Sequence, residues 1–501
     1  MTRVLVVLSL VLVACSSSES GSASSTNPPT VPITSGSESC QVTPEVIWLV
    51  EGQTARATVA CDRGDPIVTL DDAPAGLDFE EGTLTWTPSL DQAGTYPLVL
   101  GPGIEWTVGV ADAFADPDNV AVAAPETLTH EFGLQVLHLY SGEGLSTDYH
   151  DGTLVHGGRS SAVEVRLRGA LSLQYPKPNL TVKVPDGFRS GDPAFDGLDR
   201  LVLVAGFDDT SLIRNRLAQQ LWADIDDRHL TVPHANVVLY LDGYYAGLYT
   251  LLENVNDDYL ARRGFDPAAQ LFKAADARAD FRLDDDPDPT VGFEKKSGEP
   301  VDGPAALGPV ADLVDFVALA DEARFRADLA RWIDVPDAID WFVFVSFISA
   351  GDSANKNAYW VQPARGGPFR YVPWDFNHSF GQDFGTARLA PEAQLPEEFT
   401  VRNGLFERLW ADPARREEVV TRYRELLAGP LAPVALERTV DGLEAEIDAS
   451  LQRNDQRWGE AYRTFRLWVD RTDFRDGPGE IAYIREWIER RHQAVTEALK
   501  G

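Results

Sequence analysis

Residues 339–361 read IDWFVFVSFISAGDSANKNAYWV, and residues 369–378 read FRYVPWDFNH. The first stretch is an apolar run that ends in a polar segment containing Asp352 and Asn357. The second is a short apolar strand pattern that delivers Asp375. Polar side chains at the mouth of apolar elements are held rigidly, as a catalytic site requires. We therefore expect a site built from these two segments.

Asp352 and Asn357 stand five residues apart. The same spacing separates the Asp and Asn of the protein-kinase catalytic loop, where the Asp orients or deprotonates the attacking hydroxyl, and the Asn and a later Asp hold magnesium. Asp375 would be that later Asp, because carboxylate and amide oxygens suit Mg²⁺. A structural interpretation stays open, in which Asp352 caps a turn and Asp375 satisfies buried backbone donors. His378 has no Cys or His at ligand spacing and does not predict zinc.

The first half of the large C-terminal part, residues 130–290, reads as β-rich. Residues 163–168 alternate strictly between apolar and polar, as a half-buried strand does. Within 237–252, Asp242-Gly243 favours the type I′ turn of a hairpin. Between these strands we expect a helix at about 211–224, with an apolar stripe at a spacing of four formed by Ile213, Leu217 and Leu221.

The second half of this part reads as helical. We expect helices over 311–330 and 337–349, a strand over 369–373, and helices from about residue 405 almost to the end. Strands followed by helices along one chain indicate an α+β fold.

Five groups of residues occur in a fixed order along this region. They are Leu167-Arg168-Gly169 with Pro176-Lys177 and Val182-Lys183; Asp209 to Leu217 with Arg214-Asn215; Leu239 to Glu253 with Asp242-Gly243; Gly351-Asp352 to Asn357-Ala358-Tyr359; and Val372-Pro373-Trp374-Asp375-Phe376-Asn377. Together they resemble the spore-coat protein H (CotH) kinase family over about 130–498. The resemblance implies an atypical protein-kinase-like, two-lobed fold, with a β-rich lobe, a helical lobe and a nucleotide cleft between them.

The resemblance also implies roles for the site residues. Asp352 matches the family's catalytic Asp, and Asn357 and Asp375 match the pair that holds Mg²⁺. Lys183, with Lys177 as the second candidate, matches the lysine region that meets the phosphates of ATP. A lysine on a half-buried strand can instead extend its charge to solvent.

Three further positions bear on the resemblance. Glu253 falls where a lobe-connecting segment would pass adenine. We expect Arg168 and Arg214 to pair with Asp208 and Asp209 rather than to brace the site. The family's usual Asn-Ser-Ser after Arg-Gly is replaced here by residues 170–172, ALS, which leaves an altered activity open.

The implied function is an exported kinase that transfers the γ-phosphoryl group of ATP to Ser or Thr of secreted or surface proteins. A non-catalytic pseudokinase that acts as a surface scaffold or adhesin is the alternative. A metal-dependent phosphoester hydrolase with the same carboxylates is a third interpretation.

The N-terminus predicts export and lipid anchoring. Residues 1–14 combine a short positive start with an apolar run too short to span a bilayer, as in a signal peptide. Cys15 follows Leu-Val-Ala, which matches a bacterial lipobox and predicts a lipidated residue that tethers the protein to the cell envelope. Residues 15–38, rich in Ser, Gly, Thr and Pro, predict a flexible linker.

A small all-β domain is expected over 39–111, followed by the kinase-like domain over 126–499. The short strands and turns of residues 39–111 predict a sandwich, and residues 73–100 resemble the immunoglobulin-like modules of bacterial surface proteins. Cys40 and Cys61 are the cysteines left after Cys15, and an exported pair is expected to form a disulfide. The net charge of −34 argues against nucleic acid as a partner.

Overall fold

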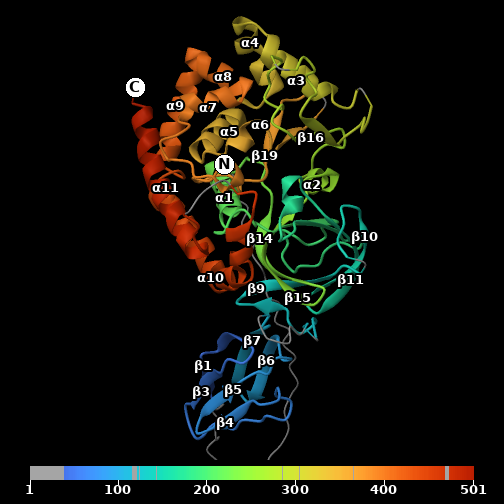
Figure 1. The fold of residues 1–501 in the computed structure, drawn as a ribbon, viewed down its shortest axis with the longest axis vertical. Coiled ribbons are helices and arrows are strands. Elements are labelled where there is room, and N and C mark those ends of the chain that lie inside the picture. The colour runs from blue at the N-terminus through green and yellow to red at the C-terminus, as the bar shows by residue number, and fades with distance from the viewer. Residues whose placement is uncertain are drawn as a thin grey trace, which may run out of the picture.

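The computed structural model describes residues 39–500 except 115–120, 123, 143, 285, 304, 365 and 469–472. Figure 1 shows a small β module at the bottom of the view, a β-barrel above it at the right, and a helical body that rises over both. The mixed α+β fold expected from the sequence is confirmed, with strands in the first half and helices in the second. The predicted signal peptide, Cys15 and linker lie outside the described residues.

The N-terminal module consists of two small sheets that share one hydrophobic core. The first contains, in spatial order, β1 (Cys40–Thr43), β3 (Ala55–Cys61), β5 (Thr83–Trp86) and β4 (Asp78–Glu80); the second contains β2 (Val46–Val50), β7 (Ile104–Ala111) and β6 (Gly94–Gly101). Trp86 from one sheet and Trp106 from the other are both buried in that core. The expected disulfide between Cys40 and Cys61 is confirmed. The likeness to immunoglobulin modules stays a prediction.

The next part of the chain forms one sheet that closes into a barrel. Its strands lie in the order β10 (His150–His156), β11 (Arg159–Leu167), β12 (Leu180–Lys183), β13 (Arg200–Val204), β15 (Tyr244–Glu253), β14 (His234–Leu241), β9 (Leu134–Tyr140) and β8 (His130–Glu131). Pairing of β9 with β10 closes the barrel. The predicted strand 163–168 and the predicted hairpin are confirmed, and Asp242 and Gly243 both have positive φ, as a type I′ turn requires.

The alternation along β11 and β12 decides which side chains enter the barrel. Val163, Val165 and Val182 face the inner core, so the residues between them point outward. Arg166 and Lys183 are therefore on the outer face, on the same side as Val202 of β13. That outer face packs against a second sheet, in the order β17 (Phe293–Ser297), β16 (Gln270–Ala274), β18 (Ala358–Gln362) and β19 (Arg370–Pro373).

The helical body covers the other side of that second sheet. Its α-helices are α1 (Arg214–Ile225), α3 (Gly308–Leu319), α4 (Glu322–Trp332), α5 (Val335–Phe347), α6 (Gly351–Asn355), α7 (Pro396–Phe399), α8 (Gly404–Ala411), α9 (Pro413–Leu427), α10 (Pro433–Thr464) and α11 (Gly477–Ala498). The short helix α2 (Asp257–Arg262) packs instead in the core between the barrel and the second sheet. Short 3₁₀ turns are η1 (Leu171–Gln174), η2 (Phe384–Thr386) and η3 (Thr400–Arg402). Among the described residues, no helix has the length and apolarity needed to cross a membrane.

Two of the helix predictions need comment. The single helix predicted over 311–330 is wrong, because α3 ends before the extended Ala320 and α4 starts afresh. The Asp321 side chain accepts a hydrogen bond from the Arg324 backbone at 2.8 Å, which caps the new helix and fixes the break. The helix predicted over 211–224 is confirmed, although it starts at Arg214, and Leu217 and Leu221 are buried on its inner side.

Candidate active site

The predicted polar segments meet at one end of the β18–β19 pair. Ala358 pairs with Pro373 in antiparallel register, so the residues just outside this pair, Asn357 and Asp375, lie at the same end. Both have left-handed backbones, with φ of 54° for Asn357 and 62° for Asp375. Such conformations cost energy for residues other than glycine and are concentrated at functional sites. Asp352 reaches the same region from the first turn of α6, directly after the buried helix α5.

His378 connects two acidic residues of this region. Its Nδ1 lies 3.4 Å from Asp352 Oδ2, and its Nε2 lies 3.3 Å from Asp208 Oδ2. Burial alone would lower the pKa of His378, but the two carboxylates outweigh it and raise that pKa to about 10. The imidazole is therefore a cation at neutral pH, held between two anions.

Asp352 is held on one oxygen only. Lys356 Nζ lies 3.1 Å from Asp352 Oδ2, the same oxygen that faces His378. Burial would raise the pKa of Asp352, but His378 and Lys356 hold that pKa below its usual value. Asp352 is thus an ionised carboxylate, and its side chain is a quarter exposed, so solvent reaches it.

Asp208 is the buried member of the cluster. The Tyr175 hydroxyl donates to Asp208 Oδ2 at 3.2 Å, and the Asn377 side chain donates to the same oxygen. Burial opposes ionisation of Asp208, yet the hydrogen bonds from His378 and Asn377 keep its pKa below the ordinary value. A fixed negative charge therefore faces the predicted metal ligand Asp375.

Asp375 and Asn357 have side chains that no other described residue engages. No described residue donates a hydrogen bond to the Asp375 carboxylate or forms an ion pair with it, and the Asn357 amide is likewise unpartnered. Burial, followed by the charge of Asp208, raises the pKa of Asp375. A divalent cation would relieve this repulsion, and two oxygen donors at one end of a hairpin suit Mg²⁺. Within the described ranges no group of three or more His, Cys, Asp or Glu is arranged for a metal, so Mg²⁺ here would also need phosphate or water oxygens.

Two cationic side chains lie near Asp375. Arg168, just beyond β11, places its guanidinium 5.3 Å from the Trp374 ring, and its Nη1 is buried with no hydrogen-bond partner among the described residues. The expected pairing of Arg168 with Asp208 or Asp209 is wrong, because its electrostatic neighbours are Tyr359 and Asp375.

Lys273 of β16 is an electrostatic neighbour of both Asp375 and Arg168. Its Nζ lies 5.8 Å from the Tyr359 ring, and no described carboxylate pairs with it. Burial, and then the charge of Arg168, lowers the pKa of Lys273. Neither Arg168 nor Lys273 forms an ion pair with a described carboxylate, although Asp375 is an electrostatic neighbour of both.

Lys183 lies on strand β12, on the outer face of the barrel. Its Nζ is 2.8 Å from Glu164 Oε2 and 3.7 Å from the centre of the Tyr149 ring. Arg166 stacks on the same ring at 4.6 Å. Lys183 is thus a partly exposed lysine that is paired with Glu164 and shares the Tyr149 ring with Arg166.

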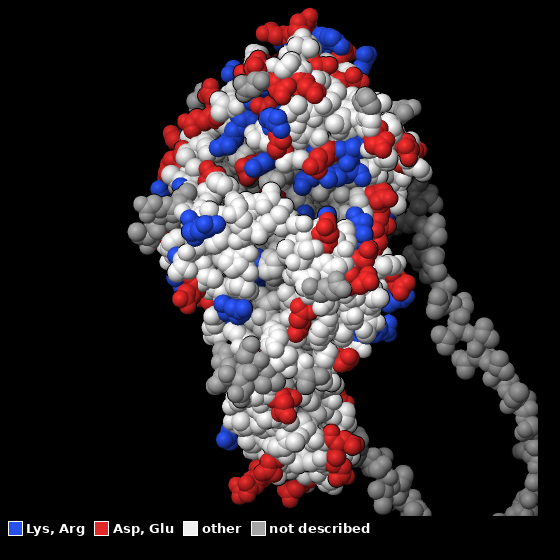
Figure 2. Space-filling model, turned by 45° about the vertical axis from the view of Figure 1, so that its right-hand side comes forward, with Lys and Arg blue, Asp and Glu red and all other residues white. Residues whose placement is uncertain are grey.

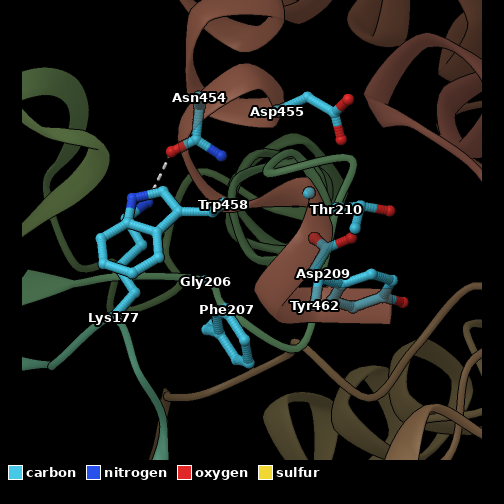
Figure 3. Close-up of a pocket in the computed structure, with 10 residues that line it drawn as sticks. Lys177, Gly206, Phe207, Asp209, Thr210, Asn454, Asp455, Trp458 and Tyr462 are labelled. Atoms are coloured by element: carbon cyan, nitrogen blue, oxygen red, sulfur yellow. Dashed lines mark hydrogen bonds between the residues drawn. The ribbon is translucent and has the colours of Figure 1, made fainter. Parts of the chain in front are cut away.

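Lys177, the second lysine candidate, is buried in a different pocket, where Figure 3 shows it beside Asn454 and Trp458. Its Nζ donates to the Ala205 carbonyl and to Asn454 Oδ1, each at 2.8 Å, and also to the Leu248 carbonyl. All three N–H donors of an ammonium are used, so a phosphate would have to displace a protein partner. Burial lowers the pKa of Lys177 well below its ordinary value.

Glu253 ends strand β15 and is engaged by arginines of α2 and its C-cap. Arg263 Nη2 lies 2.8 Å from one carboxylate oxygen, and Arg262 Nε lies 3.5 Å from the other. Burial raises the pKa of Glu253 against the opposing charge of these arginines. The structure brings Glu253 into contact with neither Asp352 nor Asp375.

Sequence reasoning missed the residues that tie the site together. His378 was considered only as a zinc ligand, Asp208 only as a salt-bridge partner, and Lys273 not at all. The available signal was position, because His378 follows Asp375 by three residues and Asp208 follows the buried strand β13. Only tertiary structure brings these residues together.

Comparison with known proteins identifies similar sequences. Residues 165–495 match a family model described as "CotH kinase protein". The chain is also similar to "Inner spore coat protein H" of Bacillus subtilis (strain 168), with 26% identity over 313 residues that cover 61% of this chain and 80% of that protein. All the predicted site residues lie inside the matched segment.

Proposed function

This chain belongs to the CotH kinase family, and from that premise we propose that it transfers the γ-phosphoryl group of ATP to a serine or threonine hydroxyl. The observation that carries the proposal is the joining of Asp352 to Asp208 through His378, with the unpartnered Asp375 facing Asp208. This arrangement offers one carboxylate for a hydroxyl proton and another for a metal ion.

We assign the barrel and the helical body to the two lobes of a kinase-like domain. The second sheet packs on the outer face of the barrel, and the cationic side chains gather where they meet. Figure 2 shows Lys and Arg side chains grouped in the upper middle of one face, with acidic side chains around them. A triphosphate lying there would meet positive charge in a protein that is otherwise strongly acidic.

Arg168 and Lys273 are the proposed phosphate ligands. Neither forms an ion pair with a described carboxylate, and the buried, unpartnered Nη1 of Arg168 needs an acceptor. A guanidinium can also donate two parallel hydrogen bonds to one phosphate group. Lys183, the first candidate from the sequence, would support these two side chains and would not be a primary phosphate ligand.

Asn357 and Asp375 would hold Mg²⁺ together with phosphate oxygens. When bound, Mg²⁺ supplies positive charge that stabilises the phosphates during transfer. Asp375 offers the metal a carboxylate that no described residue engages in a hydrogen bond or an ion pair, and its pKa is raised by burial and by Asp208.

Asp352 would accept the proton of the acceptor hydroxyl. As the hydroxyl oxygen forms a bond to the γ-phosphorus, the bond between that phosphorus and the bridging oxygen breaks, and ADP leaves with the electron pair. Positioning and charge stabilisation would do most of the catalysis, because phosphoryl transfer needs little covalent chemistry from the protein.

The proposed acceptor is a secreted or surface protein. The support is the N-terminal sequence, which predicts export and anchoring at Cys15, and the disulfide, which suits an oxidising compartment. The small β module would then act as a spacer or binding module outside the membrane.

A non-catalytic pseudokinase is the second candidate, because both lysines chosen from the sequence are engaged by protein partners. Nucleotide-dependent stabilisation and radiolabel transfer separate the two. The kinase is stabilised by Mg·ATP and labels itself or an added acceptor, whereas a scaffold that binds no nucleotide does neither.

A further inference from the structure

The two oxygens of the Asp352 carboxylate differ, because cationic side chains contact one of them and not the other. Both cations that contact Asp352, His378 and Lys356, lie on Oδ2. No described residue contacts Oδ1, and the side chain remains partly exposed. The acceptor hydroxyl therefore has one defined oxygen on which to dock.

His378 is itself held in a fixed orientation. Its far nitrogen contacts Asp208, which also accepts hydrogen bonds from Tyr175 and Asn377. The ring has Phe384 at its edge, with centroids 6.0 Å apart. An imidazole fixed at both nitrogens cannot turn without breaking an ion pair.

A buried clamp holds the two segments that carry this pair. Arg214 Nη1 lies 2.6 Å from Asp209, next to Asp208, and its Nε donates to the backbone carbonyl of Ser379, next to His378. Arg214 is fully buried. The contact between Asp208 and His378 is thus supported from behind by packed groups, as a functional constellation requires.

From these contacts we propose that the Asp208–His378 pair is a positioning device for the transfer reaction, which directs Asp352 Oδ1 at the acceptor hydroxyl. The inference rests on the proposed function. During transfer the hydroxyl proton goes to Oδ1 while the oxygen bonds to the γ-phosphorus and ADP departs. His378 touches neither substrate, and it keeps its own proton.

The test is a double-mutant cycle in the full-length protein. His378→Gln keeps a polar side chain but removes the fixed cation, and we expect kcat for label transfer to fall about 10- to 100-fold, the usual loss for a supporting partner. KM for ATP and the stabilisation by Mg·ATP should stay close to wild type. In an Asp352→Asn background the same substitution should have little further effect, because His378 acts through Asp352. His492→Gln, a half-buried histidine of α11, is the matched control and should change nothing.

Two results would overturn the inference: an unchanged kcat in His378→Gln, or an equal loss in the Asp352→Asn background, which would indicate a general structural effect. If the wild-type protein transfers no phosphate at all, the proposed function fails instead. The contacts can then be tested by imidazole ¹⁵N NMR, where Asp208→Asn and Asp352→Asn should each lower the pKa of His378. An imidazole that titrates near 6.5 in the wild type would refute the arrangement.

Discussion

Arg214 donates a hydrogen bond from Nε to the backbone carbonyl of Ser379 at 3.0 Å, and thereby ties helix α1 to the segment that follows strand β19. Its other nitrogens reach Asp209 and Glu480, each at 2.6 Å. The pairing of Arg214 with Asp209 expected from the sequence is confirmed. One buried guanidinium therefore joins the barrel side of the site, α1 and the last helix.

Glu480→Gln should destabilise the protein strongly. Burial opposes the charge of Glu480, but Arg214 and Arg388 outweigh it and lower its pKa to about 2. Removing the anion leaves both guanidinium groups poorly compensated, which typically costs about 3–5 kcal/mol. Urea unfolding measures the loss. Glu392→Gln, which removes an exposed partner of Arg490, is the control and should leave the midpoint unchanged.

Arg168→Met should weaken ATP binding. A hydrogen bond to a charged group contributes about 1.5–3 kcal/mol, so the Kd for Mg·ATP should rise at least about tenfold. Calorimetric titration gives the value. Arg228→Met removes an exposed arginine paired with Asp226 and should leave the Kd as it is. Equal affinities in the two variants would remove Arg168 from the phosphate site.

The pH dependence of stability should reveal His378. Its folded pKa of about 10 lies above the unfolded value near 6.5, because Asp208 and Asp352 outweigh the effect of burial. The stabilisation from these contacts is thus fully present below pH 6.5 and is lost as the pH rises through 10. The difference in unfolding free energy between wild type and His378→Gln should shrink over that range. A difference that grows with pH would contradict the assignment.

Removing the disulfide should destabilise only the N-terminal module. Cys40 and Cys61 are 21 residues apart, a loop for which the cross-link contributes about 3 kcal/mol. A Cys40→Ser/Cys61→Ser variant should lower the melting transition of the module, followed by calorimetry. Label transfer should persist, because no described site residue lies in this module. Loss of transfer at a temperature where the barrel and the helical body remain folded would show that the module takes part.

Local signals in the sequence predicted much of the fold. Strict alternation in 163–168 and the Asp242-Gly243 turn encode a strand and a hairpin by themselves, and both are confirmed. The barrel also needs β14 to pair in parallel with β9, two strands from distant parts of the chain, and no local pattern indicates that pairing. Asp321 is a residue type that caps helices, so the sequence held a local signal for the break, but that signal was not used to divide the helix predicted over 311–330.

The site divides in the same way. Asp352 and Asn357 were predicted from a spacing within one segment of chain, and Asp375 from the strand pattern that follows it, so local patterns were sufficient to choose them. Asp208 lies far earlier in the sequence, and it meets His378 only because α1 and the barrel pack together. Arg168 was expected to pair with Asp208 or Asp209, but these acids pair with His378 and Arg214, and the acidic neighbour of Arg168 is Asp375.

The most direct test of the central claim is transfer of label from γ-³²P-ATP by the purified full-length protein with Mg²⁺, compared with its Asp375→Asn variant. The account predicts labelled protein in the wild type, and loss of at least about 99% of the label in the variant, as expected when a metal ligand of a phosphotransferase is removed. Asp383→Asn, which changes a half-buried Asp that caps the 3₁₀ turn η2, should label normally. Undiminished labelling by Asp375→Asn would contradict the claim that this carboxylate holds the metal of a kinase site.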